Sequence, residues 1–309
     1  MITKEETGER MLPFTDIHLK HRETMQSFVA AAGGRQMEQS FAGLYIWSHK
    51  FKVQLCQYKD FLLCLASKPC PPYYLMPIGQ GDPASVLPAM EEDAHAKGNP
   101  FVLRGLTASM RQRIETALPK RYQFTPNRAS ADYLYLAKDL QELSGRKYHS
   151  KRNFIARFEE TYHNRWSYEP ITKDNLKDVW AFQDMWCRKN DCASNVSLQE
   201  ESTSIALLLY NMDALRATGG LLYADGRVAA FTVGSLIGKD TMDIHVEKAD
   251  YETVGAYPMI NREYARRGCA GVTYINREED MGLEGLRRAK LSYGPVEVCE
   301  KFTAVLRRN

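Results

Sequence analysis

The chain has 309 residues, of which 44% are hydrophobic and 26% carry a charge, and its formal net charge is +3. This length and hydrophobic content are enough for two ordinary cores, so two domains are expected. The near balance of charge argues against unspecific coating of nucleic acid, and no apolar run approaches the roughly 20 residues of a membrane helix.

The N-terminus and the cysteines give expectations about location and chemistry. The first ten residues, MITKEETGER, are too charged for a signal peptide, so a cytoplasmic protein without an integral membrane segment is expected. The seven cysteines include no C-x-x-C pair, and Cys187 and Cys192 lie far from histidines in the sequence. We therefore expect reduced thiols and no metal site.

The first half of the chain reads as a mixture of helices and strands. Helices are predicted at 18–32, 85–97 and 109–118, and strands at 51–58, 61–67, 73–79, 101–106 and 132–140. Gly33 and Gly34 mark the end of the first helix. The segment SFAGLYIW at 40–47 is expected to pack in the core of the first domain.

The second half repeats this alternation after a basic helical stretch at 145–162 that joins the halves. A tight turn at Asp225-Gly226 indicates a hairpin. Strands are predicted at 166–171, 219–225, 227–238, 241–250 and 271–276, and helices at 174–189, 200–215 and 257–267, before a last helix and a strand that follows Pro295. This pattern predicts an α/β unit with a mixed sheet.

The segment NREEDMGLEGLRRAKLSYGP at 276–295 is the most informative motif. A strand runs into an acidic loop and then an amphipathic helix, which is where α/β enzymes place ligand chemistry. Helical periodicity puts Lys290 on the apolar face of that helix, beside Leu286 and Tyr293. The pattern favours a lysine that packs its methylenes on the core and extends its ammonium to water.

A second motif, TMDIHVEKAD at 241–250, alternates strictly. Alternation places Asp243, His245 and Glu247 on one face of a strand. That row faces either a cavity or a solvated edge. In a cavity, the histidine and a carboxylate could deprotonate an attacking amine or hold its ammonium.

These two motifs and SFAGLYIW resemble stand-alone bacterial proteins similar to the C-terminal domain of phosphatidylglycerol lysyltransferase. The resemblance covers nearly the whole chain and implies two tandem GNAT-like (acyl-CoA N-acyltransferase) domains of the α/β class with mixed sheets. It implies a structural first domain at 1–143, and at 144–309 a catalytic second domain that includes the joining helix.

The resemblance also implies a transfer reaction and its donor. The GNAT donor loop usually reads Gln/Arg-x-x-Gly-x-Gly/Ala; here Gly255 and Ala256 fit, but Glu252 and Tyr257 oppose a pyrophosphate by charge and volume. We therefore expect aminoacyl-tRNA as donor and a small molecule or lipid as acceptor. The alternatives are acetyl-CoA as donor, or a non-catalytic pair of domains that binds a charged small molecule.

Roles follow from the resemblance for individual residues. Expected catalytic residues are His245, Glu247, Asp280 and Tyr293, the last as an acid. Expected substrate-binding residues are Asp243, Asn276, Glu279, Arg287 and Lys290: the acids would bind an α-ammonium, the cations a phosphate or oxyanion. Lys147, Lys151 and Arg152 would contact tRNA. The alternative is that the loop acids and the basic helix are simply solvated.

Overall fold

The computed structural model describes residues 11–307, which divide into two compact units. The first comprises the described parts of Met1–Gly33 and Glu300–Asn309 together with Trp47–Arg128; the second comprises Gly34–Ile46 and Ala129–Cys299. Each unit contains one mixed sheet, so the predicted α/β class with two mixed sheets is confirmed. Within residues 11–307, no helix combines the length and apolar character needed to cross a bilayer.

The sheet of the first unit has the order β1-β2-β3-β4-β6-β15-β7, with β5 paired to β3. Its strands are Thr15–Asp16, Val53–Tyr58, Phe61–Ala66, Tyr73–Leu75, Ile78–Gly79, Val102–Thr107, Tyr122–Pro126 and, as β15, Lys301–Leu306. Its helices are α1 (Arg22–Ala32), α3 (Ser48–Phe51), α4 (Leu87–Ala96) and α5 (Ala108–Ala117). The left-handed backbone of Gly33 ends α1, as predicted.

The sheet of the second unit has the order β14-β8-β13-β12-β11-β10-β9. In chain order its strands are β8 (Asp132–Leu136), β9 (Trp166–Pro170), β10 (Thr218–Ala224), β11 (Arg227–Ile237), β12 (Thr241–Ala249), β13 (Tyr274–Asn276) and β14 (Glu297–Cys299). Its helices are α2 (Phe41–Ile46), α6 (Ala137–Glu142), α7 (His149–Thr161), α8 (Leu176–Lys189), α9 (Val196–Tyr210), α10 (Met212–Leu215), α11 (Ala256–Arg267) and α12 (Glu284–Leu291).

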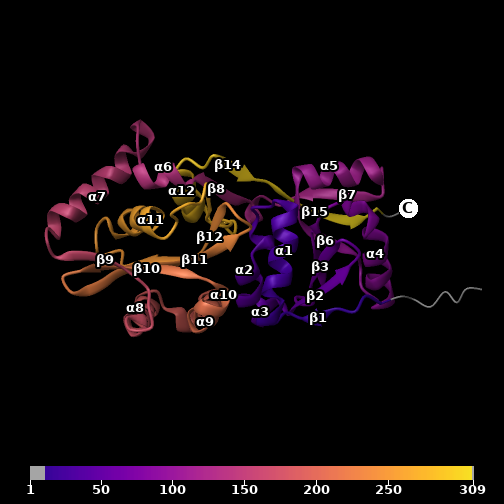
Figure 1. The fold of residues 1–309 in the computed structure, drawn as a ribbon, viewed down its shortest axis with the longest axis horizontal. Helices are drawn as coiled ribbons and strands as arrows, with labels where there is room; N and C mark the ends of the chain where they lie inside the picture. The colour runs from indigo at the N-terminus through magenta and orange to yellow at the C-terminus, as the bar shows by residue number, and fades with distance from the viewer. Residues whose placement is uncertain (1–10, 308–309) are drawn as a thin grey trace, which may run out of the picture. The chain divides into compact units, whose positions relative to one another are not determined.

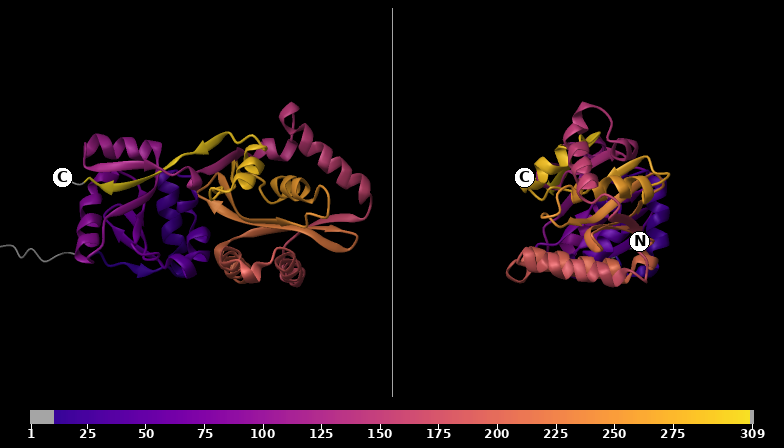
Figure 2. Two further views of the ribbon diagram at one scale, coloured as in Figure 1. Left: turned by 180° about the vertical axis from the view of Figure 1, so that it is seen from behind. Right: turned by 90° about the vertical axis from the view of Figure 1, so that its left-hand side faces the viewer.

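Helices cover both faces of this second sheet (Figure 1, and from behind in Figure 2). Helices α8 and α9 cover one face, where the ammonium of Lys248 on β12 pairs with Glu201 of α9 and lies 3.7 Å from the ring centroid of Trp186 on α8. Helix α11 covers the other face, where Met259 packs with Ala249 of β12. The helices therefore bury both surfaces of β12.

The contacts divide the chain differently from the predicted boundary at 143/144. Strand β8 pairs with β13 and β14, so residues 129–143 belong to the second unit. Strand β15 pairs with β6 and β7, so residues 300–307 belong to the first. The segment 132–140 is a strand followed by α6, and β7 and β15 were not predicted.

Two further expectations are corrected. Most of the segment SFAGLYIW forms α2 and packs in the second unit rather than the first, because Phe41–Ile46 contact α9; only its last residue, Trp47, belongs to the first unit. Cys187 and Cys192 form a disulfide rather than free thiols, because the end of α8 and the turn after it bring their Cα atoms to 5.0 Å.

Candidate functional site

The candidate site lies where β12 and β13 separate. These parallel strands pair only between Thr241–Asp243 and Tyr274–Asn276. Beyond that point β12 continues to Ala249, while the chain after Asn276 enters the predicted acidic loop. Polar side chains from both segments meet in the space between the strands, the kind of position where α/β proteins bind ligands.

A β-bulge at His245 divides the predicted row of polar residues. Val233 of β11 is opposite Val246, but the next residue, Gly234, is opposite Ile244, so His245 has no partner in the ladder. An extra residue reverses the alternation of side chains. Asp243 and His245 consequently lie on the side of α2, whereas Glu247 faces α11. The expectation that all three residues share one face was wrong, because it assumed a regular strand in which side chains alternate without interruption.

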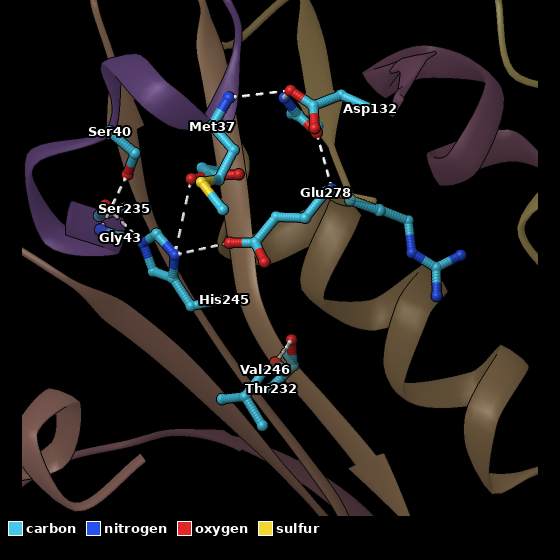
Figure 3. A network of polar contacts seen from close by, with 12 residues as sticks. Met37, Ser40, Gly43, Asp132, Thr232, Ser235, His245, Val246 and Glu278 are labelled. Atoms are coloured by element: carbon cyan, nitrogen blue, oxygen red, sulfur yellow. Dashed lines mark hydrogen bonds and ion pairs between the residues drawn. The ribbon is translucent and has the colours of Figure 1, made fainter. Parts of the chain in front are cut away.

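We call Asp243, His245, Glu278 and Ser235 the His245 cluster; Figure 3 labels the last three of these residues. The Nε2 atom of His245 lies 2.8 Å from the Ser235 hydroxyl. Its Nδ1 atom lies 3.1 Å from Glu278 Oε1 and 3.5 Å from Asp243 Oδ2. The side chains of Asp243 and His245 are 0% exposed, whereas that of Glu278 is 18% exposed. Glu278 is therefore the acid that a substrate can reach.

The protonation of this cluster follows from its burial. Burial, and then the charge of Glu278, raise the pKa of Asp243 to about 8; His245 opposes the increase, and the Ser40 side chain opposes it least. Burial lowers the pKa of His245, with Asp243 acting in the opposite direction. A neutral imidazole thus lies between two carboxyl groups of unequal basicity.

Lys290 fixes the loop that carries Glu278. Its ammonium is buried and donates to the carbonyl oxygens of Arg277 at 2.6 Å, Glu278 at 3.2 Å and Glu279. Burial, and then the charge of Arg277, lower its pKa to about 8. The expectation of an ammonium that reaches water was wrong. Its three N–H groups are used within the protein, which supports a positioning role rather than the predicted contact with substrate.

The backbone of this loop is strained, and its strain has a visible consequence. Glu278 has φ +53°, in the left-handed region that non-glycine residues rarely adopt. The Glu278 side chain reaches His245, while that of Arg277, one residue earlier, reaches Glu247. Consecutive residues of one loop therefore meet the two faces of β12.

We call Glu247, Arg277, Asn261, Lys151 and Tyr293 the Arg277 cluster. Arg277 Nη2 lies 2.7 Å from Glu247 Oε1, and Asn261 of α11 donates to Glu247 Oε2 at 3.0 Å. The Arg277 guanidinium and the Lys151 ammonium lie 4.8 Å and 4.1 Å from the ring centroid of Tyr293. Arg277 Nη1 and Asn261 Oδ1 are buried without a hydrogen-bond partner.

Charge in the Arg277 cluster is unbalanced, with two cations and one carboxylate. Burial lowers the pKa of Lys151, the charge of Arg277 lowers it further, and Glu247 opposes both. Burial raises the pKa of the Tyr293 phenol well above its usual value, although Arg277 opposes the increase. Tyr293 is therefore a neutral hydrogen-bond donor at neutral pH.

Other predicted site residues lie in contacts internal to the protein. Asp280 is buried and pairs with Arg287 at 2.8 Å, and that contact holds the pKa of Asp280 far below its usual range. Asn276 donates to Asp132 and to the Arg35 carbonyl, and accepts from the Glu278 amide at 2.7 Å. These contacts are made within the protein and brace the loop.

The predicted donor-binding residues are dispersed. Lys147 pairs with Asp139 at 2.9 Å, and Arg152 donates to the carbonyl oxygens of Leu143 and Gly145. Of the three basic residues, Lys151 alone belongs to the Arg277 cluster.

Helix α7 covers the predicted donor loop at the start of α11. A Cβ atom built on Gly255 would lie 2.3 Å from the Phe154 carbonyl oxygen. The amide of Ala256 donates to Thr253. Gly255 therefore allows two segments to pack closely, and neither residue presents a free phosphate cradle.

Sequence reasoning missed Ser235, Asn261, Arg277 and Glu278 as site residues. Arg277 and Glu278 lie in the acidic loop of the 276–295 motif. Two consecutive charged residues directly after a strand are a pattern that could have identified them as site residues. Ser235 and Asn261 carried none, because β11 and α11 are identified by periodicity alone. Their proximity depends on tertiary pairing.

A family model described as "Phosphatidylglycerol lysyltransferase, C-terminal" matches residues 31–305. An uncharacterised protein of Mycoplasmoides gallisepticum is 24% identical over 176 residues, which are 56% of each chain, so the match spans about half of that relative. No transfer of function follows from a relative of that description.

Solved structures give a fuller match. A conserved protein of unknown function from Bacteroides thetaiotaomicron is 41% identical, with a TM-score of 0.92 over 96% of this chain and 100% of that one. The C-terminal domain of a putative lysylphosphatidylglycerol synthetase from Agrobacterium fabrum is 12% identical, with a TM-score of 0.66 over 94% and 92%. L-PGS from Bacillus licheniformis is 15% identical, with a TM-score of 0.64 over 99% and 95%. At such low identity, the last two show the fold alone.

Proposed function

Because this chain belongs to the family described as the C-terminal part of phosphatidylglycerol lysyltransferase, we propose that it transfers an aminoacyl group from aminoacyl-tRNA to a small-molecule or lipid acceptor. One observation carries the proposal: at a single point of β12, a buried acid–base cluster lies on one face and an incompletely satisfied ion pair on the other. Transfer needs both kinds of group, a base for the acceptor and a site for the charged donor.

The Arg277 cluster suits the aminoacyl donor. An aminoacyl ester carries an α-ammonium and a carbonyl whose oxygen becomes negative during attack. The Glu247 carboxylate and Asn261 Oδ1 can accept from the ammonium, and Arg277 Nη1, which lacks a partner, can donate to the developing oxyanion. The tyrosine proposed as an acid, Tyr293, lies beside Arg277 and can protonate the leaving oxygen.

The His245 cluster suits the acceptor. Glu278 is the partly exposed acid, so its carboxylate takes the proton of the attacking hydroxyl or amine. Neutral His245 contacts that carboxylate through Nδ1 and Ser235 through Nε2, and so orients it. The new ester or amide bond forms as the bond to the tRNA ribose oxygen breaks.

An acyl-CoA donor is less well supported. Pyrophosphate binding at a helix N-terminus needs free amides and open space. Here α7 packs on Gly255, Pro258 lacks an N–H, and the loop before α11 carries Asp250 and Glu252, which pair with Lys189 at 3.0 Å and 2.6 Å. A loop with this charge and packing favours the tRNA donor over acetyl-CoA.

The direct test measures transfer of a radiolabelled amino acid from charged tRNA. Purified protein is incubated with tRNA charged with each amino acid in turn, and with phosphatidylglycerol vesicles or a mixture of small amines. We expect label to appear in one acceptor fraction. Arg277→Met and Glu278→Gln should each reduce the rate about 100-fold or more.

The matched control is Arg262→Met. Arg262 is also an ion-paired arginine, bound to Glu159 at 2.7 Å, but it lies outside both clusters. Its variant should transfer at close to the wild-type rate. Absence of label with every charged tRNA, or equal rates for the Arg277 and Arg262 variants, would refute the proposal.

A further inference from the structure

The His245 cluster has the composition and spacing of a metal site. We propose that Asp243, His245 and Glu278 bind a divalent transition-metal ion such as Zn²⁺. This inference goes beyond the proposed function, since it concerns an ion that aminoacyl transfer does not itself require. It also differs from the expectation of no metal site, which considered only ligands close together in the sequence.

The ligand atoms have suitable spacing. One atom each from Asp243, His245 and Glu278 lies within 4.8 Å of the other two. In a tetrahedral site with metal–ligand bonds of about 2.0–2.1 Å, neighbouring ligand atoms are roughly 3.3 Å apart. The observed distances from His245 Nδ1 to the two carboxylates, 3.1 Å and 3.5 Å, bracket that value.

The buried carboxylate of Asp243 supplies an independent observation. Its side chain is fully buried, and neither of its oxygen atoms has a hydrogen-bond partner. A buried carboxyl group whose contacts, such as that of Oδ2 with His245 at 3.5 Å, are too long or too poorly aligned for hydrogen bonds is costly, and proteins pair such groups or use them to coordinate metals. No lysine or arginine pairs with Asp243 in the part of the chain that the structure describes. A divalent ion would satisfy its oxygens and balance two carboxylates.

Histidine chemistry favours the same assignment. A neutral imidazole carries one N–H group and one nitrogen with a free lone pair, and that second nitrogen can bind a metal ion. If Nε2–H donates to Ser235, Nδ1 becomes the ligand atom, and a hydrogen bond on the other ring nitrogen is typical of metal-binding histidines. Two oxygens and one imidazole suit Zn²⁺ or Mn²⁺ better than Ca²⁺ or Mg²⁺, which prefer oxygen alone.

Three protein ligands leave a coordination position for another oxygen. Catalytic metal sites keep such a position for water or substrate, whereas structural zinc sites have four protein ligands. Glu278 is the ligand on the exposed side, so this position would be reached from its side of the cluster. The bound ion would lower the pKa of a hydroxyl or water there.

The test measures metal binding directly, without reference to transfer. Chelator-treated protein is titrated calorimetrically with Zn²⁺, and Co²⁺ is then used to record the visible spectrum. We expect one equivalent to bind and a cobalt spectrum of a four-coordinate site without thiolate charge transfer, which excludes the free cysteines. Asp243→Asn and His245→Gln should weaken binding at least tenfold.

A surface histidine provides the matched control, because exposed imidazoles also bind metal ions. His163 is exposed, and His163→Gln should bind one equivalent as the wild type does. Absence of binding by the folded wild type, or equal binding by the His163 and His245 variants, would overturn the proposal. If a buried variant fails to fold, Glu278→Gln at the exposed side gives the same comparison. Metal binding without aminoacyl transfer would refute only the proposed function.

Discussion

The ammonium of Lys290 lies 2.6 Å from the carbonyl oxygen of Arg277, and it also binds the next two carbonyl oxygens of the loop. One side chain of α12 thus fixes the backbone from which Arg277 and Glu278 extend to opposite faces of β12. The arrangement ties the two candidate clusters to one buried lysine.

Replacing Lys290 with methionine should therefore impair both stability and transfer. Methionine fills the apolar space but leaves carbonyl oxygens unpaired, at a cost of about 1–3 kcal/mol of unfolding free energy. Because displacement by about 1 Å can cost 100-fold in rate, we expect transfer to fall by that order. Denaturant unfolding and the tRNA assay measure the two effects.

The control for this variant is Arg288→Met on the exposed face of the same helix. The Arg288 side chain is 76% exposed, so its loss should change stability by less than about 0.5 kcal/mol. If Lys290→Met retains both the stability and the transfer rate of the Arg288 variant, the positioning role is wrong.

We expect any side chain at Gly255 to be destabilising. Its φ of +87° lies in the left-handed region, and a Cβ atom there would lie 2.3 Å from the Phe154 carbonyl oxygen of α7, so Gly255→Ala combines backbone strain with a steric clash. Gly271 has a similar φ of +84° but open space around it, so Gly271→Ala isolates the strain. We expect Gly255→Ala to lose about 1–3 kcal/mol more in thermal or denaturant unfolding. Equal losses would show that α7 does not pack there.

Lys151 and Lys147 should differ in their effect on the donor. Lys151 belongs to the Arg277 cluster, whereas Lys147 is 53% exposed and paired with Asp139. Lys151→Gln should reduce transfer from aminoacyl-tRNA about tenfold, which corresponds to about 1.4 kcal/mol, and Lys147→Gln less than twofold. Rates measured at two salt concentrations separate loss of phosphate attraction from loss of positioning. The reverse order would place the donor on the outer surface of α7.

Lys248 should make stability depend on alkaline pH. Burial lowers its pKa, although Glu201 opposes the shift. Between that lowered pKa and the ordinary value of about 10.4, the unfolded chain binds more protons than the folded one, so wild-type stability increases with pH. Relative to Lys248→Met, the wild type should therefore gain stability as the pH rises from 7 towards 10. The unfolding free energies of both proteins are measured by denaturation at each pH. A difference between them that stays constant with pH would contradict this prediction.

The sequence was sufficient to predict most helices and strands, and it singled out the two segments that form the candidate clusters. The strand at 241–250, the loop after Asn276 and the helix that carries Lys290 all have strong periodicity or turn residues, and the resemblance supplied their connection. The features that were not predicted depend on residues that are distant in the sequence but close in the fold. The bulge at His245 depends on its register with β11, and the burial of Lys290 depends on three carbonyl oxygens that no pattern reveals.

Long-range pairing also hid the two candidate clusters. His245 and Glu278 are separated by 33 positions, and Glu247 and Arg277 by 30. Arg277 and Glu278 look like ordinary charged loop residues in the sequence, and only the folded loop brings their side chains to Glu247 and His245 of β12. By contrast, Asp280 and Arg287 looked functional by composition, yet each satisfies the other.

The position of β15 between β6 and β7 affects the order in which the two sheets can form during synthesis. Residues 301–306 must leave the ribosome before the first sheet can be completed, although the last of its other strands, β7, ends at Pro126, which is 175 positions before Lys301. During translation the second unit can therefore complete its sheet first. A fragment of residues 144–309 would lack β8 and would contain β15 without its pairing strands β6 and β7. Unpaired strands of this kind promote aggregation.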